Sequence, residues 1–364
     1  MKEHNPNIPY QRLLNLRING GRLDSPEQVV TQLGAMQAQD YHQALWAIGL
    51  RMQAATVTDI EQAIADRKIV LTWSMRGTIH FVPPADMRWM LKISASRLLK
   101  QDNRRLEQLE LNQEIIERAR QISYDAMQGG RRISRPVLMQ LLEDEGISRQ
   151  RGYHLLWYLG QSGHICLGPR DGKQQTFVLL DEWVPQANEL SMDESLAVLA
   201  ERYFTSHGPA TVHDFAWWAG ITLTDARRGV EAVQFRLVSK KVNDQVYWEG
   251  GQSRAGSVDA ESTVYLLPGF DEHLLGYKDR SAVLRAEYAS KIVPGNNGVF
   301  MPTILIDGQV AGLWKRTMKK KGIDMEFNLF APHEDQADRI LETARRYCTF
   351  MELPMAETSF QVVE

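Results

Sequence analysis

The feature that most constrains this chain is a repeated order of elements, in which helices are followed by a β-hairpin. Three stretches show this order, at about residues 25–82, 134–180 and 191–248. Each stretch begins with a residue typical of a helix N-cap and ends in two β-rich runs joined by a turn. The copies share the order of their elements and the residue types at the element boundaries, but sequence identity between the copies is low. A chain of 364 residues is longer than a domain with a single hydrophobic core usually is. Together with the repeated order of elements, this length predicts a tandem array of domains.

In the first copy, Ser25 is the expected cap of a helix and Pro26 its first residue. Two further short helices lead to strands predicted at 69–74 and 79–82, and the second strand is stopped by two prolines. Helices followed by a hairpin are the order of a winged helix. Residues 85–127 are then expected to form an exposed connector that is helical throughout.

The second and third copies repeat this order, with helices expected to begin at Ser134 and Ser191. The strands predicted in them are 164–167 with 176–180, and 237–242 with 245–248. After a linker at 250–256, short strands are predicted at 264–267, 303–306, 309–314 and 325–330. A helix from about residue 334 to 348 is expected to close the chain.

The predicted fold is therefore mainly α with β-hairpins (α+β), with tandem winged-helix repeats followed by a small antiparallel β domain. The expected domains are 1–125, 126–190, 191–255 and 256–364, and the last of them carries the terminal helix.

Composition limits the possible functions. The formal net charge is −3, so a DNA-binding role requires Lys and Arg to be segregated onto one face. Two cysteines in unrelated contexts indicate neither a zinc site nor a disulfide framework, and favour a reducing compartment. The first residues lack the apolar core of a secretion signal, and no stretch reaches the roughly 18 apolar residues of a membrane span. We expect a cytoplasmic protein.

Common catalytic signatures are absent from the sequence. No Gly-rich phosphate loop precedes a helix, Gly-x-Ser-x-Gly does not occur, and the scattered histidines predict no metal site or cofactor. The run Asp271-Glu272-His273 is dense in ionisable groups. Its carboxylates could be catalytic, but an ion-paired structural loop, with Arg280 or Lys278 neutralising Asp271 or Asp279, is the slightly favoured interpretation. The basic segment 315–321 is either an exposed turn or a phosphate contact.

Two glutamines, Gln37 and Gln39, stand directly before an apolar segment at 44–50. In an extended chain their side chains point the same way, which would place two amides over one spot. Taken alone, this pattern also suits a polar loop between helices, because glutamine is mostly a surface residue.

Four motifs together resemble the AlkZ-type bacterial DNA glycosylases. They are Gln37-Ala38-Gln39-Asp40, the hairpin 73–80, the run 270–281, and the strands 301–308 with Gly312-Leu313-Trp314. The resemblance spans nearly the whole chain. It implies tandem winged helices and a C-terminal β domain arranged as a C-shaped clamp around duplex DNA, and it implies removal of alkylated purines, in some members including interstrand cross-links.

The resemblance also implies that the family's catalytic Gln-x-Gln motif falls on Gln37 and Gln39. Relatives of another branch that open cross-links have Asp at the second position, so broad cross-link opening is not expected here. An amide carbonyl can hold a water in line with the sugar carbon, although it cannot take the proton as a carboxylate does. Two amides therefore suit cationic N7- or N3-alkylpurines, which leave without protonation. Asp40 is an alternative base if its side chain points inward.

Candidate phosphate contacts lie on the predicted hairpins and helix pairs. They are Arg76 and His80, Arg149 and Arg151, Lys240 and Lys241, and Arg280. The expected partner is double-stranded DNA with alkylated purines, bound by a monomer. Access to the sugar from a groove is favoured over base flipping. The alternatives are a non-catalytic winged-helix regulator and a scaffold for protein interactions, because fold alone does not decide function.

Overall fold

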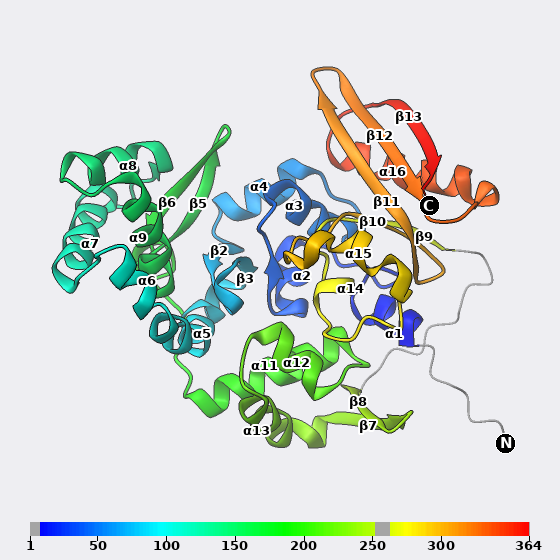
Figure 1. The fold of residues 1–364 in the computed structure, drawn as a ribbon, viewed down its shortest axis with the longest axis horizontal. Coiled ribbons are helices and arrows are strands. Elements are labelled where there is room, and N and C mark those ends of the chain that lie inside the picture. Colours follow the sequence, from blue (N-terminus) through cyan, green and yellow to red (C-terminus); the bar gives the residue numbers. More distant parts are fainter. Residues whose placement is uncertain (1–7, 252–262, 364) are drawn as a thin grey trace. The chain divides into compact units, whose positions relative to one another are not determined.

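In a computed structural model, residues 8–251 and 263–363 are described, and the chain divides into two compact units. The first unit contains Met1–Ile60, Ala197–Trp218 and Thr222–Glu364, and the second contains Glu61–Leu196 with Ala219–Ile221. The expected mixture of helices and hairpins is confirmed (Figure 1). The winged-helix arrangement within each copy and the four-domain division stay predictions. The predicted linker lies outside the described residues from residue 252 onward.

Helices dominate the N-terminal and middle parts of the first unit. Ser25 caps α2 as predicted, because its hydroxyl accepts a hydrogen bond from the backbone N–H of Gln28. In α3 every residue except His42 is buried, which explains why its sequence is apolar on all sides. The elements are α1 (Ile8–Asn15), α2 (Pro26–Leu33), β1 (Met36–Gln37), α3 (Tyr41–Leu50), α4 (Val57–Ala65, running into the second unit), α11 (Met192–His207, entering from the second unit), α12 (Val212–Ala219) and α13 (Leu223–Val233).

The third predicted hairpin is confirmed as β7 (Leu237–Val242) and β8 (Gln245–Gly250), which pair antiparallel. The two turn residues, Asn243 and Asp244, both have positive φ (46° and 63°). This is the backbone of a type I′ turn, which Asn and Asp tolerate better than most residues.

A five-stranded sheet with the order β13-β12-β11-β10-β9 forms the C-terminal part of the first unit. Its strands are β9 (Val264–Leu267), β10 (Thr303–Ile306), β11 (Gln309–Lys319), β12 (Gly322–Leu329) and β13 (Met355–Val362). The expected antiparallel sheet is wrong at one edge, because β13 pairs parallel with β12. The crossover through α16 (Ala337–Phe350) makes this possible, since a helix can return the chain in the same direction. The basic segment 315–321 is mostly strand, within β11.

Aromatic side chains join α3 to this sheet. The Trp46 ring lies 5.2 Å from both Tyr347 and Phe350 of α16, measured between ring centroids. The indole N–H groups of Trp46 and Trp314 donate to the backbone carbonyls of Leu266 and Leu267, at 2.8 and 2.7 Å. The packed rings and the hydrogen-bonded indole N–H groups fix α3 against the sheet, and with it the start of the segment that precedes α3.

In the second unit the first two predicted hairpins share one sheet, in the strand order β3-β2-β5-β6-β4. The pairing of Leu71 with Leu167 joins the hairpins. The sequence predicted the hairpins but not this junction. The strands are β2 (Val70–Trp73), β3 (Ile79–Val82), β4 (Ile133–Ser134), β5 (Ile165–Asp171) and β6 (Gln174–Leu179).

The expected continuous helix from 85 to 127 is wrong. Three helices occupy this stretch: α5 (Met87–Gln101), α6 (Asn103–Gln108) and α7 (Gln113–Met127). The side chain of Asn112 accepts a hydrogen bond from the backbone N–H of Ile115, so Asn112 starts a new helix. The remaining helices of this unit are α8 (Arg135–Asp144), α9 (Arg149–Gln161) and α10 (Leu180–Trp183).

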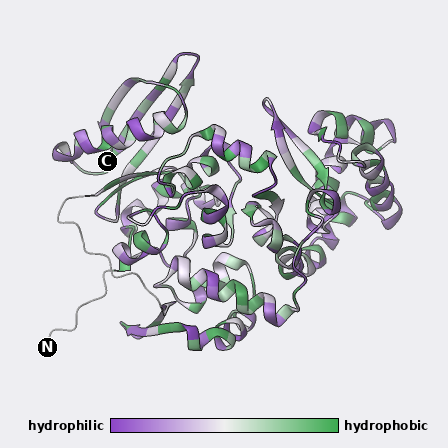
Figure 2. Ribbon diagram, turned by 180° about the vertical axis from the view of Figure 1, so that it is seen from behind, coloured by the Kyte–Doolittle hydropathy of each residue, from purple (hydrophilic) through white to green (hydrophobic). Residues whose placement is uncertain are grey.

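Hydrophilic and hydrophobic residues are mixed along the helices of both units (Figure 2). In α7 the buried residues Ile116, Ala119, Ser123 and Met127 recur every three or four positions, as on one face of a helix. Among residues 8–251 and 263–363, none of the helices has the length and apolar character needed to cross a membrane. Cys166 and Cys348 are buried and free.

Candidate active site

The candidate catalytic segment lies between α2 and the buried helix α3. Gly34 ends α2 with a φ of 81°, β1 extends through Gln37, and Asp40 caps α3. The Asp40 carboxylate accepts a hydrogen bond from the backbone N–H of Gln43 at 3.2 Å. An N-cap is the usual role of an Asp at this position. The geometry therefore favours the cap over the alternative in which Asp40 points inward as the base.

The two glutamines differ in environment. Gln37 is 7% exposed, whereas Gln39, in the bend before α3, is exposed. Strand β1 covers Met36–Gln37 and ends before Gln39, so the strand does not include both glutamines, and their pairing over one spot stays a prediction. The motif therefore combines a buried Gln37 with a Gln39 that solvent can reach.

A loop 235 residues away in sequence contacts the backbone of Gln37. The backbone N–H of Gln37 donates to Oε1 of Glu272 at 3.2 Å. Nearby, the side-chain oxygen of Gln43 accepts from the backbone N–H of Gly269 at 3.1 Å. Phe270, between these contacts in sequence, has a φ of 61°, which is rare for a bulky residue and marks local backbone strain.

Asp271 forms its ion pair with a partner that the sequence did not indicate. Arg51 Nη1 and Nη2 bind the two carboxylate oxygens of Asp271 at 2.8 and 2.9 Å, and both side chains are buried. The expected neutralisation of Asp271 by Arg280 or Lys278 is therefore wrong. Arg51 is available because it follows α3 directly, where an apolar run ends inside the protein.

Glu272 lies in a buried polar cluster. Its Oε2 accepts from the indole N–H of Trp218 at 2.8 Å and lies 3.3 Å from Nε2 of His207. Nδ1 of His207 lies 2.8 Å from the hydroxyl oxygen of Ser206. Burial lowers the pKa of His207, because the charged imidazolium loses its water, and the hydrogen bond to Glu272 opposes this effect. The sequence does not predict this cluster, although the ionisable run 271–273 belongs to it.

Of the predicted DNA contacts on the first hairpin, Arg76 is half-buried and His80 is buried. The φ of Arg76 is 57°, and its Nη2 lies 3.4 Å from Nε2 of His80. With 1% exposure, His80 is placed to support the hairpin rather than to meet a phosphate directly. Arg76 stays a candidate contact.

Arg149 and Arg151 lie in the first turn of α9, as expected for a second helix of a helix pair. Each has an acidic neighbour: Arg149 contacts Glu143 at 3.2 Å, and Arg151 pairs with Glu110. Surface pairs of this kind are weak, so a phosphate can replace the carboxylate.

Lys240 and Lys241 are exposed on β7, and Lys241 pairs with Asp244 in the turn at 2.8 Å. Arg280 is different, because it is partly buried and its Nε donates to the carbonyl oxygen of Leu274 at 2.8 Å. Its guanidinium carbon lies 4.8 Å from the ring centre of Phe300. Burial also lowers the pKa of Arg280. Arg280 is thus partly committed to the loop that supports Gln37.

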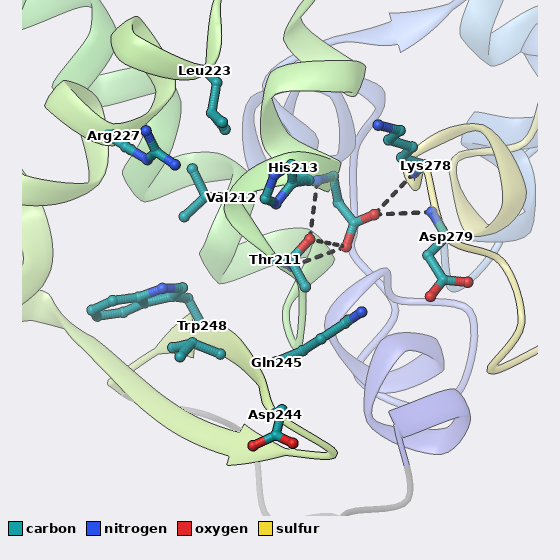
Figure 3. A pocket seen from close by; sticks show the side chains of 12 residues that line it. Thr211, Val212, His213, Leu223, Arg227, Asp244, Gln245, Trp248, Lys278 and Asp279 are labelled. Atoms are coloured by element: carbon teal, nitrogen blue, oxygen red, sulfur yellow. Dashed lines mark hydrogen bonds between the residues drawn. The ribbon is translucent and has the colours of Figure 1, made fainter.

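A cavity of about 820 Å³ lies beside α12, α13 and the β7–β8 hairpin (Figure 3). The residues that line this cavity do not include Gln37, Gln39 or Asp40. Asp214 accepts hydrogen bonds from the backbone N–H groups of Thr211, Lys278 and Asp279, at 2.9 to 3.1 Å. These bonds tie the start of α12 to the loop after Tyr277. The described parts of the chain hold no cluster of three or more His, Cys, Asp or Glu suited to a metal ion.

The structure combines helices and antiparallel hairpins with a Gln-Ala-Gln segment that lies ahead of a buried helix. A family model described as DNA glycosylase AlkZ-like matches residues 30–350. The chain therefore belongs to the AlkZ-like DNA glycosylase family, which confirms the expectation of an enzyme of this class.

Two further comparisons found similarity to DNA glycosylases of Streptomyces sahachiroi. The chain is 25% identical over 313 residues to a Streptomyces sahachiroi protein named interstrand DNA cross-link repair glycosylase, covering 80% of this chain and 82% of the relative. The solved structure of the Streptomyces sahachiroi DNA glycosylase AlkZ matches with a TM-score of 0.80 and 20% identity, over 97% of this chain and 98% of that one. This second match shows a shared fold.

Proposed function

We propose that this DNA glycosylase hydrolyses the N-glycosidic bond of cationic N7- or N3-alkylated purines in duplex DNA, with a water positioned by Gln37 and Gln39. The observation that carries the proposal is the environment of this pair. Gln37 is fixed by a backbone hydrogen bond to Glu272, and Gln39 is exposed on the same segment. A fixed backbone at Gln37 and an accessible amide at Gln39 suit a water that must be aimed at the sugar carbon.

The substrate class follows from the chemistry of the amides. Their carbonyl oxygens accept hydrogen bonds from water and stabilise a sugar that becomes positively charged, but they do not remove a proton as a carboxylate does. An alkylated purine that already carries a positive charge leaves without help from an acid. The capping contact of Asp40 leaves the glutamines as the groups proposed to act on water.

Duplex DNA is proposed to bind through phosphate contacts from Arg76, Arg149 and Arg151 of the second unit and from Lys240 and Lys241 of the first unit. The exposure of both lysines supports this role for β7. The family assignment favours the enzyme over a non-catalytic regulator.

Interstrand cross-links are a second candidate substrate, because the Streptomyces relative is named for their repair. A cross-link between two N7-alkylated guanines has a cationic leaving base at each end, so the same chemistry applies to it. The expectation that a glutamine at position 39 limits cross-link opening stays a prediction.

The test uses duplex DNA with a single N7-methylguanine and measures abasic sites under single-turnover conditions. Gln37→Ala and Gln39→Ala should each lower the rate by about 100-fold, as for loss of one positioned polar group. Gln53→Ala is the matched control, because Gln53 is an exposed glutamine of the same unit. Release of the base at the same rate by wild type and the double variant would refute the proposal. A parallel assay with cross-linked duplex decides the second substrate.

A further inference from the structure

Glu272 is a buried carboxylate that contacts the backbone of the candidate catalytic segment. It is 2% exposed, and its two oxygens face different elements. Oε1 accepts from the backbone N–H of Gln37 in β1, and Oε2 accepts from the indole N–H of Trp218 in α12 and faces His207 of α11. One side chain therefore connects the proposed active site to two helices of the same unit.

We propose that Glu272 is a positioning residue, which fixes the backbone of Gln37 so that its amide holds the water in line. This inference rests on the proposed function of Gln37. Burial removes several kcal/mol of hydration free energy from a carboxylate. Well-packed apolar residues at the same position often stabilise a fold equally well. A carboxyl group at this position therefore indicates a need for hydrogen bonds in defined directions.

The neighbouring ion pair separates the roles of the two acidic residues. Arg51 binds both oxygens of Asp271, which leaves Glu272 to act on β1 through hydrogen bonds. Asp271 also accepts from the backbone N–H of His273 at 2.9 Å, and so caps the short helix α14 (Glu272–Leu275). Asp271 anchors the loop, and Glu272 reaches from that anchored loop to Gln37.

An isosteric change should disrupt this arrangement without changing shape. Glu272→Gln has one acceptor oxygen and one NH₂ donor in place of two acceptor oxygens. The N–H groups of Gln37 and Trp218 approach opposite oxygens, so an amide satisfies one of them and opposes the other. Either orientation loosens the link between β1 and α12.

The experiment compares wild type, Glu272→Gln, Gln37→Ala and the double variant on the N7-methylguanine duplex under single-turnover conditions. Glu272→Gln should lower the rate by up to about 100-fold, as for a displaced catalytic group, with the Kd for DNA changed less than about 2-fold. In the Gln37→Ala background the same change should have almost no further effect, because Glu272 acts through Gln37.

Asp86→Asn is the matched control, because Asp86 is also a buried carboxylate that accepts an indole N–H, from Trp89 at 3.0 Å, but in the other unit. It should leave the rate unchanged. Effects of Glu272→Gln and Gln37→Ala that multiply, or an equal loss in Asp86→Asn, would overturn the positioning role while leaving the proposed function intact. Inactive wild type, or full activity in Gln37→Ala, would overturn the proposed function and this inference with it.

Discussion

Arg51 and Asp271 meet inside the first unit through two parallel hydrogen bonds of 2.8 and 2.9 Å. Arg51 directly follows α3, and Asp271 directly precedes α14. Arg51 also donates to the carbonyl oxygens of Leu16 and Ala47, at 2.9 and 2.8 Å. The pair therefore joins the helix that follows Gln39 to the loop that contacts Gln37, and it sets the geometry of the candidate active site.

Removal of one partner should strongly destabilise this unit. Arg51→Ala leaves the Asp271 carboxylate buried without its counter-charge, which costs about 3 to 5 kcal/mol. Chemical denaturation measures the free energy of unfolding. The control is Arg149→Ala, whose pair with Glu143 is exposed and should contribute under about 1 kcal/mol. Equal effects of the two substitutions would show that the buried pair is not structurally important.

The role of Asp40 can be separated from that of a catalytic base. Asp40→Asn keeps a good N-cap for α3, so both stability and the rate of base release should be preserved. Asp40→Ala should lower the free energy of unfolding by about 1 kcal/mol through loss of the cap. A base that takes a proton contributes about 100-fold or more to rate. A loss of that size in Asp40→Asn would assign the base role to Asp40.

Local patterns predicted most of the elements. The hairpin β7–β8 was predictable because β-rich runs flank Asn243-Asp244, a pair suited to a two-residue turn. The break between α6 and α7 was missed, because the residues around Asn112 have ordinary helix propensity and only the capping bond reveals the start. The strand β13 was also missed, since its residues are mostly exposed and its pairing with β12 depends on the position of α16.

The site was only partly predictable. Gln37 and Gln39 were found because they are adjacent in sequence and match a family motif. The contacts of Glu272 with Gln37, and of Asp271 with Arg51, join residues more than 200 positions apart, and no local pattern encodes them. Sequence alone therefore indicated the candidate reacting groups but not the buried groups around them.

Acid should weaken the fold through His273, which is fully buried. Burial lowers the pKa of His273 to about 4, from 6.5. Between these values the unfolded chain binds a proton that the folded protein does not, so stability falls as the pH drops from about 6.5 to about 4. The loss from this group approaches about 3 kcal/mol.

Denaturation curves across this pH range test this effect, and His273→Leu should flatten the profile. His207, whose pKa is also lowered by burial, adds a slope of the same sign, so some dependence remains in this variant. An unchanged profile in His273→Leu would show that the pKa of His273 is the same in the folded and the unfolded chain.

The salt dependence of DNA binding tests the hairpin β7–β8 as a phosphate contact. Each lysine that neutralises a phosphate contributes about 0.9 to the slope of log K against log salt. Lys240→Ala and Lys241→Ala should each reduce the slope by about that amount and weaken binding to any duplex sequence. His80→Ala is the contrasting variant, because a buried side chain should affect stability without changing the slope. If the slope of log K against log salt falls for His80→Ala but not for the lysine variants, the phosphate contact belongs to the first hairpin and not to the third.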